Sequence, residues 1–205
     1  MTTNSHDVLQ FWFEGIDDST PIDKSRNPFR KWFTKDKGFD EEVRRRFEAD
    51  MESARLGQYQ DWESAPNGRL ALILLFDQFP RNTYRNTPKM FEYDLLALNL
   101  TKKFLTDHSD EKLNLIERVF VYMPLQHAEE LSIQKESLRC FSSLVELSRK
   151  KNPGNTPYFE NTLGYAQRHH DIIERFGRFP HRNAILNRPS TKEEAEFLAK
   201  PGSSF

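Results

Sequence analysis

The run Leu70-Ala-Leu-Ile-Leu-Leu-Phe76 is the longest unbroken apolar stretch of the chain, and Asp77-Gln-Phe-Pro80 follows it directly. Seven apolar residues in succession leave a helix no polar face, so this helix is expected to be buried at the centre of the molecule. Ser64 and Pro66 are suited to its first turn. Pro80 is expected to end it, because proline lacks a backbone donor and clashes with the preceding turn.

On both sides of this run the chain has helical periodicity and short turns marked by proline or glycine. Phe39, Val43 and Phe47 recur at intervals of four, as on one face of an amphipathic helix. Period-two alternation never persists beyond a few residues, so no strand is expected. Pro124, like Pro80, is expected to end a helix. The helices are expected within 7–13, 28–33, 39–56, 64–79, 87–105, 109–124, 127–150, 156–176 and 190–200. The sequence therefore predicts an all-α fold of about seven to nine helices in one domain, residues 1–205.

The composition indicates which binding partners and which cellular compartment to expect. The 205 residues include 30 basic and 31 acidic side chains, for a net charge of −1. So balanced a chain is not a general binder of nucleic acid or of membrane surfaces. The single cysteine, Cys140, excludes a disulfide framework, and the first residues lack the basic and apolar regions of a secretory signal. We therefore expect a cytoplasmic protein with no nucleic-acid or membrane partner.

A short motif occurs twice in the chain. Phe76-Asp-Gln-Phe-Pro-Arg-Asn82 returns as Phe176-Gly-Arg-Phe-Pro-His-Arg-Asn183. In each copy two phenylalanines three residues apart precede a proline, and an arginine and an asparagine follow it. We expect the four phenylalanines to pack in one core, which would bring both turns to the same side of the molecule. Chance similarity of two turns is the alternative.

These two runs, together with Met123-Pro-Leu-Gln-His-Ala-Glu-Glu130, resemble an uncharacterised family, the domain of unknown function 924. The similarity extends from Val8-Leu-Gln-Phe-Trp-Phe13 to Glu193-Glu-Ala-Glu-Phe-Leu198, which is nearly the whole chain. The resemblance implies a tetratricopeptide-like array of antiparallel helices. It implies no activity, because none is established for the family.

Polar side chains gather at the turns that follow three of the expected helices. Arginine suits bidentate recognition of carboxylate and phosphate groups, and histidine exchanges a proton near neutral pH. Several of each in a nearly neutral chain predict one concavity for an anionic small molecule or a peptide carboxylate. The candidate ligand-binding residues are Asp77, Arg81, Asn82, Arg85, His127, Glu130, His170, Arg178, His181, Arg182 and Asn183.

Two other interpretations of the same residues remain open. The first is a metal-independent enzyme that uses His181 or His127 as acid or base while the arginines hold an anionic substrate. The second is a structural network without a ligand, because arginine and asparagine after a helix often bond its last carbonyl groups. Within that network Asp77 or Glu130 would pair with the arginines. His170 lies on the apolar stripe of its helix, where a hydrogen-bonded core histidine is the commoner role.

Other chemistries lack their motifs. No His-Glu-x-x-His or Glu-x-x-His metal pattern occurs, and no aspartate follows Asp171 to complete the ligand set of a helical metallophosphohydrolase. The chain also lacks a Gly-x-Ser-x-Gly nucleophile motif and the glycine patterns of nucleotide-binding loops. Cys140 lies beside Phe141 on an apolar helix face, which is typical of core packing. We therefore expect no metal and no cofactor.

Overall fold

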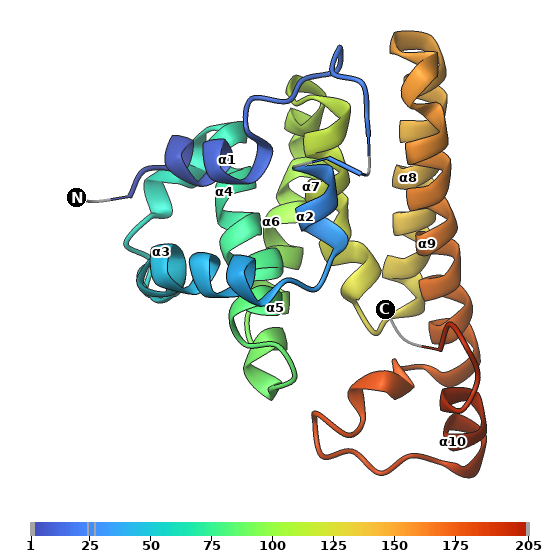
Figure 1. The fold of residues 1–205 in the computed structure, drawn as a ribbon. Helices are drawn as coiled ribbons and strands as arrows, with labels where there is room; N and C mark the ends of the chain where they lie inside the picture. Colours follow the sequence, from blue (N-terminus) through green and yellow to red (C-terminus); the bar gives the residue numbers. More distant parts are fainter. Residues whose placement is uncertain (1–2, 24, 27, 204–205) are drawn as a thin grey trace.

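The central segment of the chain is helix α4 (Pro66–Ile73), which continues through a π-helical turn (Leu74–Gln78) into α5 (Phe79–Thr83). Leu70, Ile73 and Leu74 have no exposed surface, as the apolar run predicts. This description comes from a computed structural model that covers residues 3–23, 25–26 and 28–203 (Figure 1).

All regular elements in those residues are helical, so the predicted all-α class is confirmed. The other α-helices are α1 (Ser5–Phe13), α2 (Phe29–Phe33), α3 (Lys37–Arg55), α6 (Asp94–Asp107), α7 (Leu115–His127), α8 (Leu131–Lys151), α9 (Thr156–Phe176) and α10 (Lys192–Leu198). Short 3-10 turns lie at Gln60–Ser64, Pro88–Phe91, Ser109–Lys112, Pro153–Asn155 and Pro180–Arg182.

The helices form two neighbouring groups (Figure 1). Helices α1, α3 and α6 pack against the central segment, and α7 joins it to a long antiparallel pair formed by α8 and α9. The segment after α9 turns back at the foot of this pair and ends in α10. The C-terminal segment therefore lies beside the ends of α5 and α7.

The two prolines that were predicted to end helices do not end them. The backbone hydrogen-bond pattern changes just before Pro80. There the N–H of Phe79 bonds the carbonyl of Leu74, five residues back. Pro80 then falls in the first turn of α5, where a missing N–H is tolerated. Pro124 lies inside α7, and the Thr101 hydroxyl of α6 donates to the nearby carbonyl of Val121 at 2.7 Å. A donor from a neighbouring helix thus bonds a carbonyl of the turn that precedes the proline.

The apolar core is divided, contrary to the expectation of one core for the four repeated phenylalanines. Phe76 and Phe79 belong to a large cluster that draws on α1 to α9. Phe179 belongs to a second cluster with Ile172 and Ile173, and Phe176 packs against it. The prediction was wrong because the two motifs end different helices, and each pair of rings packs against its own neighbours.

Three further expectations concern membrane spans, the helix arrangement and the number of domains. Among the described residues no helix combines the length and the apolar character that crossing a membrane requires. The tetratricopeptide-like arrangement and the single domain of residues 1–205 stay predictions.

Candidate functional site

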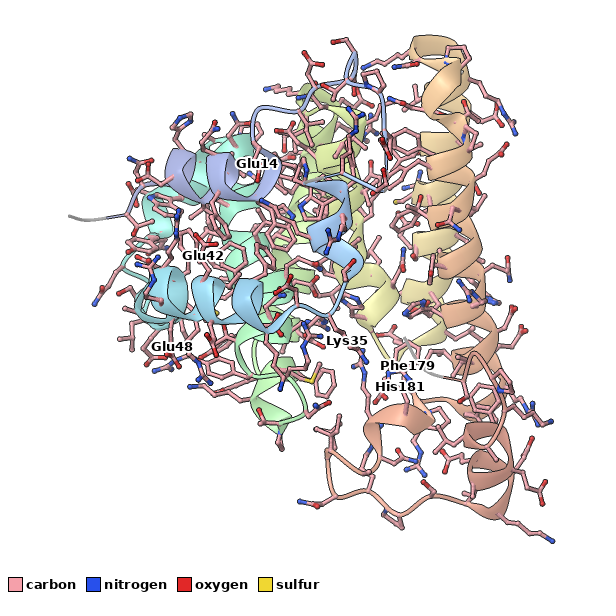
Figure 2. All side chains as sticks on the ribbon, in the orientation of Figure 1. Glu14, Lys35, Glu42, Glu48, Phe179 and His181 are labelled. Carbon is pink, nitrogen blue, oxygen red and sulfur yellow. The ribbon has the colours of Figure 1, made fainter. Side chains whose placement is uncertain are left out.

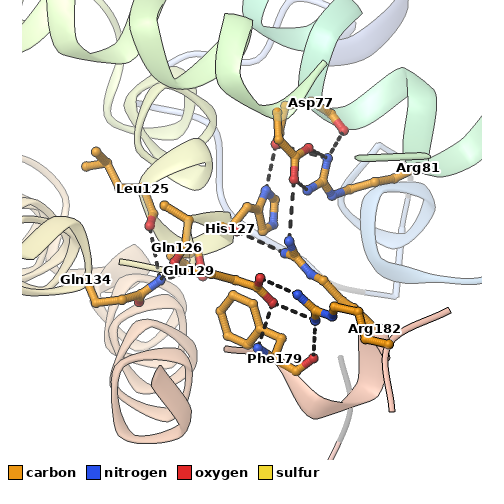
Figure 3. Close-up of polar contacts among 12 residues, drawn as sticks. Asp77, Arg81, Leu125, Gln126, His127, Glu129, Gln134, Phe179 and Arg182 are labelled. Carbon is orange, nitrogen blue, oxygen red and sulfur yellow. Dashed lines mark hydrogen bonds and ion pairs between the residues drawn. The ribbon is translucent and has the colours of Figure 1, made fainter. Parts of the chain in front are cut away.

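The carboxylate of Asp77 belongs to a polar cluster where the two repeated motifs meet (Figure 3). Its side chain is wholly buried in the π-helical turn. Its oxygens lie 2.6 Å from Nδ1 of His127, 2.5 Å from Nε2 of Gln78 and 3.2 Å from Nη1 of Arg81. Burial raises the pKa of Asp77, but the charge of Arg81 and the contact with His127 outweigh it and hold this pKa below its usual value. Asp77 is therefore an anion at neutral pH.

His127 is the last residue of α7, and a neighbouring side chain secures this helix end. Nε2 of Gln134, in α8, donates to the carbonyl oxygens of Leu125, Gln126 and Ala128 at 3.2, 2.8 and 2.7 Å (Figure 3). The carbonyl of Leu125 also accepts the N–H of Ala128 at 3.3 Å, and the amide side chain adds donors that a helix end lacks. The position of the imidazole is fixed from both sides.

The protonation state of His127 follows from its partner. A carboxylate only accepts hydrogen bonds, so the contact with Asp77 places the proton on Nδ1 and leaves Nε2 with its lone pair. Burial and the charge of Arg81 lower the pKa of His127 below its ordinary value. The ring is therefore neutral at pH 7, while 17% of the side chain stays exposed. Such a ring can accept a proton or a hydrogen bond at Nε2.

Asp94, at the start of α6, joins the arginines of the two repeats. Arg81 contacts both oxygens of Asp94, at 2.8 and 3.1 Å. Nη1 of Arg182 lies 3.6 Å from one of the same oxygens. Both turns therefore lie on the same side of the molecule, as predicted from the repeat. The sequence analysis missed Asp94, because its role depends on two arginines that are distant along the chain.

Arg182 is a buried cation with incomplete neutralisation. It is 7% exposed, and its guanidinium lies 4.6 Å from the ring centres of both Phe91 and Phe179. Nη2 donates to the carbonyl of His127 at 3.0 Å, whereas Nε has no hydrogen-bond partner among the described residues. Burial and the charge of Arg81 lower the pKa of Arg182 to about 10. Removal from water and a nearby like charge both disfavour its charged form.

Glu129 and Arg188 hold the turn that carries Arg182. The carboxylate of Glu129 accepts the backbone N–H of Phe179 at 2.7 Å and two bonds from Arg188 at 2.6 and 2.9 Å. Arg188 also donates to the carbonyl of Phe179 and to the side chain of Asn183. The predicted set contained neither Glu129 nor Arg188. The position of Glu129 in the same motif as His127 was the signal for it.

The remaining predicted residues divide among other contacts. Arg178 forms a bidentate pair with Glu194 at 2.7 and 2.8 Å, and Asn183 donates to Ser190 and Glu194. Asn82 and Arg85 both bind Asp40 of α3, and Glu130 is exposed and bonds Ser132. The structure thus brings Asp77, Arg81, His127 and Arg182 together. It directs Arg178, Asn82, Arg85 and Glu130 to partners outside this group.

The other histidines lie near the group or apart from it. The ring of His169, in α9, is 6.3 Å from that of His127, and His181 packs against Phe179 at 5.5 Å. Burial is the main cause that lowers the pKa of His169 to about 3 and that of His181 to about 4. His170 instead lies 3.4 Å from Asp171. Together with Glu174, these two residues have their ligand atoms within 4.8 Å of one another, and both carboxylates are exposed.

The family of the chain follows from comparison with known proteins. The family model described as bacterial protein of unknown function (DUF924) matches residues 8–202. The chain belongs to this family. A solved protein of unknown function from Agrobacterium tumefaciens is similar, with 34% identity, a TM-score of 0.76, and coverage of 95% of this chain and 96% of that one. No curated protein matches the chain.

A hollow of about 690 Å³ lies elsewhere in this DUF924 chain, among residues of α1, α2 and α3. It contains none of the predicted site residues. Lys31, at its wall, is paired with Glu14 at 2.6 Å, and Arg46 is paired with Glu42 at 2.7 Å. Figure 2 shows Glu14 and Glu42 well away from Phe179 and His181. The hollow therefore does not belong to the cluster around Asp77.

Proposed function

We propose that the chain is a binding module for a small anionic ligand, which presents a carboxylate or phosphate group to Arg182 beside His127. The observation that carries this proposal is the incomplete neutralisation of Arg182. Its nearest carboxylate oxygen, on Asp94, is 3.6 Å away, and Arg81 already holds Asp94 at both oxygens. An added anion would offset the charge that burial disfavours.

The surroundings of Arg182 support an anion of defined geometry. The rings of Phe91 and Phe179 contact the guanidinium and restrict its orientation. A fixed guanidinium donates in its own plane, which matches the two oxygens of a carboxylate or phosphate. His127 lies next to it, because its backbone carbonyl accepts a bond from Arg182. Its neutral ring accepts at Nε2, so it can bond only an anion that itself carries a proton, such as hydrogen phosphate.

A second candidate function is acid–base catalysis on the bound anion, and the pair of Asp77 and His127 favours it. In this pair a buried carboxylate orients the imidazole through Nδ1, which leaves Nε2 to accept a proton. General bases use the same arrangement. If the chain turns over a ligand, we expect His127→Gln to abolish turnover while ligand binding persists. The structural network would be the remaining interpretation, and the paired Arg81, Arg85 and Arg178 support it.

The test is calorimetric titration of the chain with inorganic phosphate and with acetate. We expect Arg182→Lys to weaken binding by about tenfold, because lysine keeps the charge but loses the planar fork. Arg178→Lys is the matched control, since Arg178 belongs to the same repeat and is paired with Glu194. The control should bind as the wild type does. Absence of binding to the wild type, or equal affinities of wild type and Arg182→Lys, would contradict the proposal.

A further inference from the structure

We propose that Glu129 is a positioning residue of the anion site, which sets the place of Arg182 without touching the ligand. The inference rests on the proposed function. It concerns how the site is assembled rather than what it binds. Glu129 lies two residues after His127, on the turn between α7 and α8. One short turn would therefore place both the histidine and the arginine.

Glu129 holds the backbone of the turn Phe179–Arg182. One oxygen of the carboxylate accepts the N–H of Phe179 at 2.7 Å, and Arg188 bonds both oxygens at 2.6 and 2.9 Å. Arg188 then donates to the carbonyl of Phe179 at 3.1 Å. Both backbone groups of Phe179 are thus held by one ion pair. Arg182 follows at once, because its own N–H bonds that same carbonyl at 3.1 Å.

Apolar packing contributes little to the position of this turn. Phe179 belongs to a small cluster with Ile172 and Ile173, separate from the large core that contains the segment around Asp77. Polar contacts therefore carry much of the connection between the arginine turn and the rest of the site. Directional bonds fix orientation where small apolar contacts do not.

Glu129 is not available to the ligand. Both of its oxygens are engaged by Arg188, and a carboxylate would repel an anion. Burial raises the pKa of Glu129, but the bonds from Arg188 and Phe179 lower it by more than burial raises it. The group therefore remains charged at neutral pH. Removing this negative charge would by itself favour an anion, so a loss of affinity on neutralising Glu129 must act through Arg182, whose position Glu129 fixes and whose charge it supports.

The test is a double-mutant cycle in phosphate affinity, measured by calorimetry on the full chain. We expect Glu129→Gln to weaken phosphate binding by about tenfold in the wild-type background. In the Arg182→Lys background the same change should weaken binding by less than about twofold, because the group that Glu129 positions is already lost. A merely structural role would give equal factors in both backgrounds.

The matched control is Glu193→Gln. Glu193 pairs with Arg175 at 2.6 Å and so ties α10 to α9, away from the pair of Glu129 and Arg188. We expect it to leave phosphate affinity unchanged. If Glu129→Gln fails to fold, as judged by far-UV circular dichroism, Arg188→Lys takes its place. This variant keeps the charge and loses the fork, and we expect it to weaken binding several-fold.

The outcomes separate the two proposals. If the wild type binds phosphate and Arg182→Lys binds weakly, while Glu129→Gln or Arg188→Lys binds as the wild type does, the positioning role is wrong and the anion site stands. Equal loss in both backgrounds also overturns the positioning role. If the wild type binds neither phosphate nor acetate, the anion site itself fails.

Discussion

Two carboxylates of the site are each shared by two cationic or protonatable partners. Asp77 contacts Arg81 and His127, and Asp94 contacts Arg81 and Arg182. Arg81 therefore receives most of the available negative charge, and Arg182 receives little. This unequal division distinguishes Arg182 from an arginine of a saturated network such as Arg178. It also explains why Asp94 and Glu129 do not outweigh burial and the charge of Arg81, which lower the pKa of Arg182 to about 10.

At the residue scale, His169 makes the stability of the fold depend on pH. An unfolded histidine takes up a proton near pH 6.5, whereas burial lowers the pKa of His169 in the folded chain to about 3. Between these values the unfolded state binds a proton that the folded state does not bind, so a falling pH destabilises the folded state. From pH 7 to pH 5 we expect His169 to lower the free energy of unfolding by about 2 kcal/mol.

This effect is measurable by urea unfolding at the two pH values. The variant His169→Gln should lose about 2 kcal/mol less stability than the wild type between pH 7 and pH 5. Some pH dependence should remain, because burial also lowers the pKa of His181, to about 4. The exposed His6 of α1 is the control, and His6→Gln should follow the wild type. An unchanged pH dependence in His169→Gln would contradict the burial argument.

The predictability of the site differs between residues for a physical reason. Arg81 and Arg182 were predictable as a pair, because each follows a proline that itself follows two phenylalanines three residues apart. Asp94 was not predictable, because only the folded chain brings the start of α6 to both arginines. Arg178 was assigned to the pocket by its residue type and its place at a turn after a helix, and its side chain instead forms a pair with Glu194.

At the scale of the element, the apolar run predicted the buried central helix, but local rules failed at its end. Pro80 lies past a π-helical turn, which changes the bonding pattern before the missing N–H is reached. This turn also carries Asp77, so the irregular backbone and the buried carboxylate occur together. A π-helical turn depends on tertiary packing, and the periodicity of a single helix does not reveal it.

Two glycines in α-helices differ in the space around them, which shows how closely neighbouring elements approach. A Cβ on Gly68 in α4 would lie 2.3 Å from the backbone oxygen of Trp62, whereas a Cβ on Gly164 in α9 would meet nothing within 4 Å. Alanine is the better helix former by about 1 kcal/mol. We therefore expect Gly164→Ala to stabilise the fold by about 0.5–1 kcal/mol. We expect Gly68→Ala to destabilise it by about 1–3 kcal/mol, since the clash is with backbone.

Chemical denaturation of the two variants and the wild type, at a single pH, checks this prediction. Each variant is the control for the other, because both make the same substitution inside an α-helix. Opposite signs of the stability change are expected. A stabilising Gly68→Ala would mean that the turn Gln60–Ser64 moves away from α4 at little cost.

At the scale of the whole molecule, the candidate site lies at a boundary between two apolar clusters. The large cluster includes the central segment and α7, and the small one contains Ile172, Ile173 and Phe179. The contacts from Arg182 to His127 and Asp94 cross this boundary, and so do those from Arg188 to Glu129. A bound anion between Arg182 and His127 would therefore also join the two parts of the molecule.

This arrangement predicts that the segment after α9 opens without global unfolding. Little apolar surface holds it, so its amides should exchange hydrogen faster than those of α4 and α7, which open only when the whole molecule unfolds. If opening releases the anion, phosphate at about 100 times its dissociation constant should add about 2.7 kcal/mol to the opening free energy, which slows exchange about 100-fold. Native-state hydrogen exchange of residues 177–191, with α7 as the internal reference, measures both effects. Equal exchange rates in the two regions without phosphate would mean that the polar contacts join the clusters into one cooperative unit.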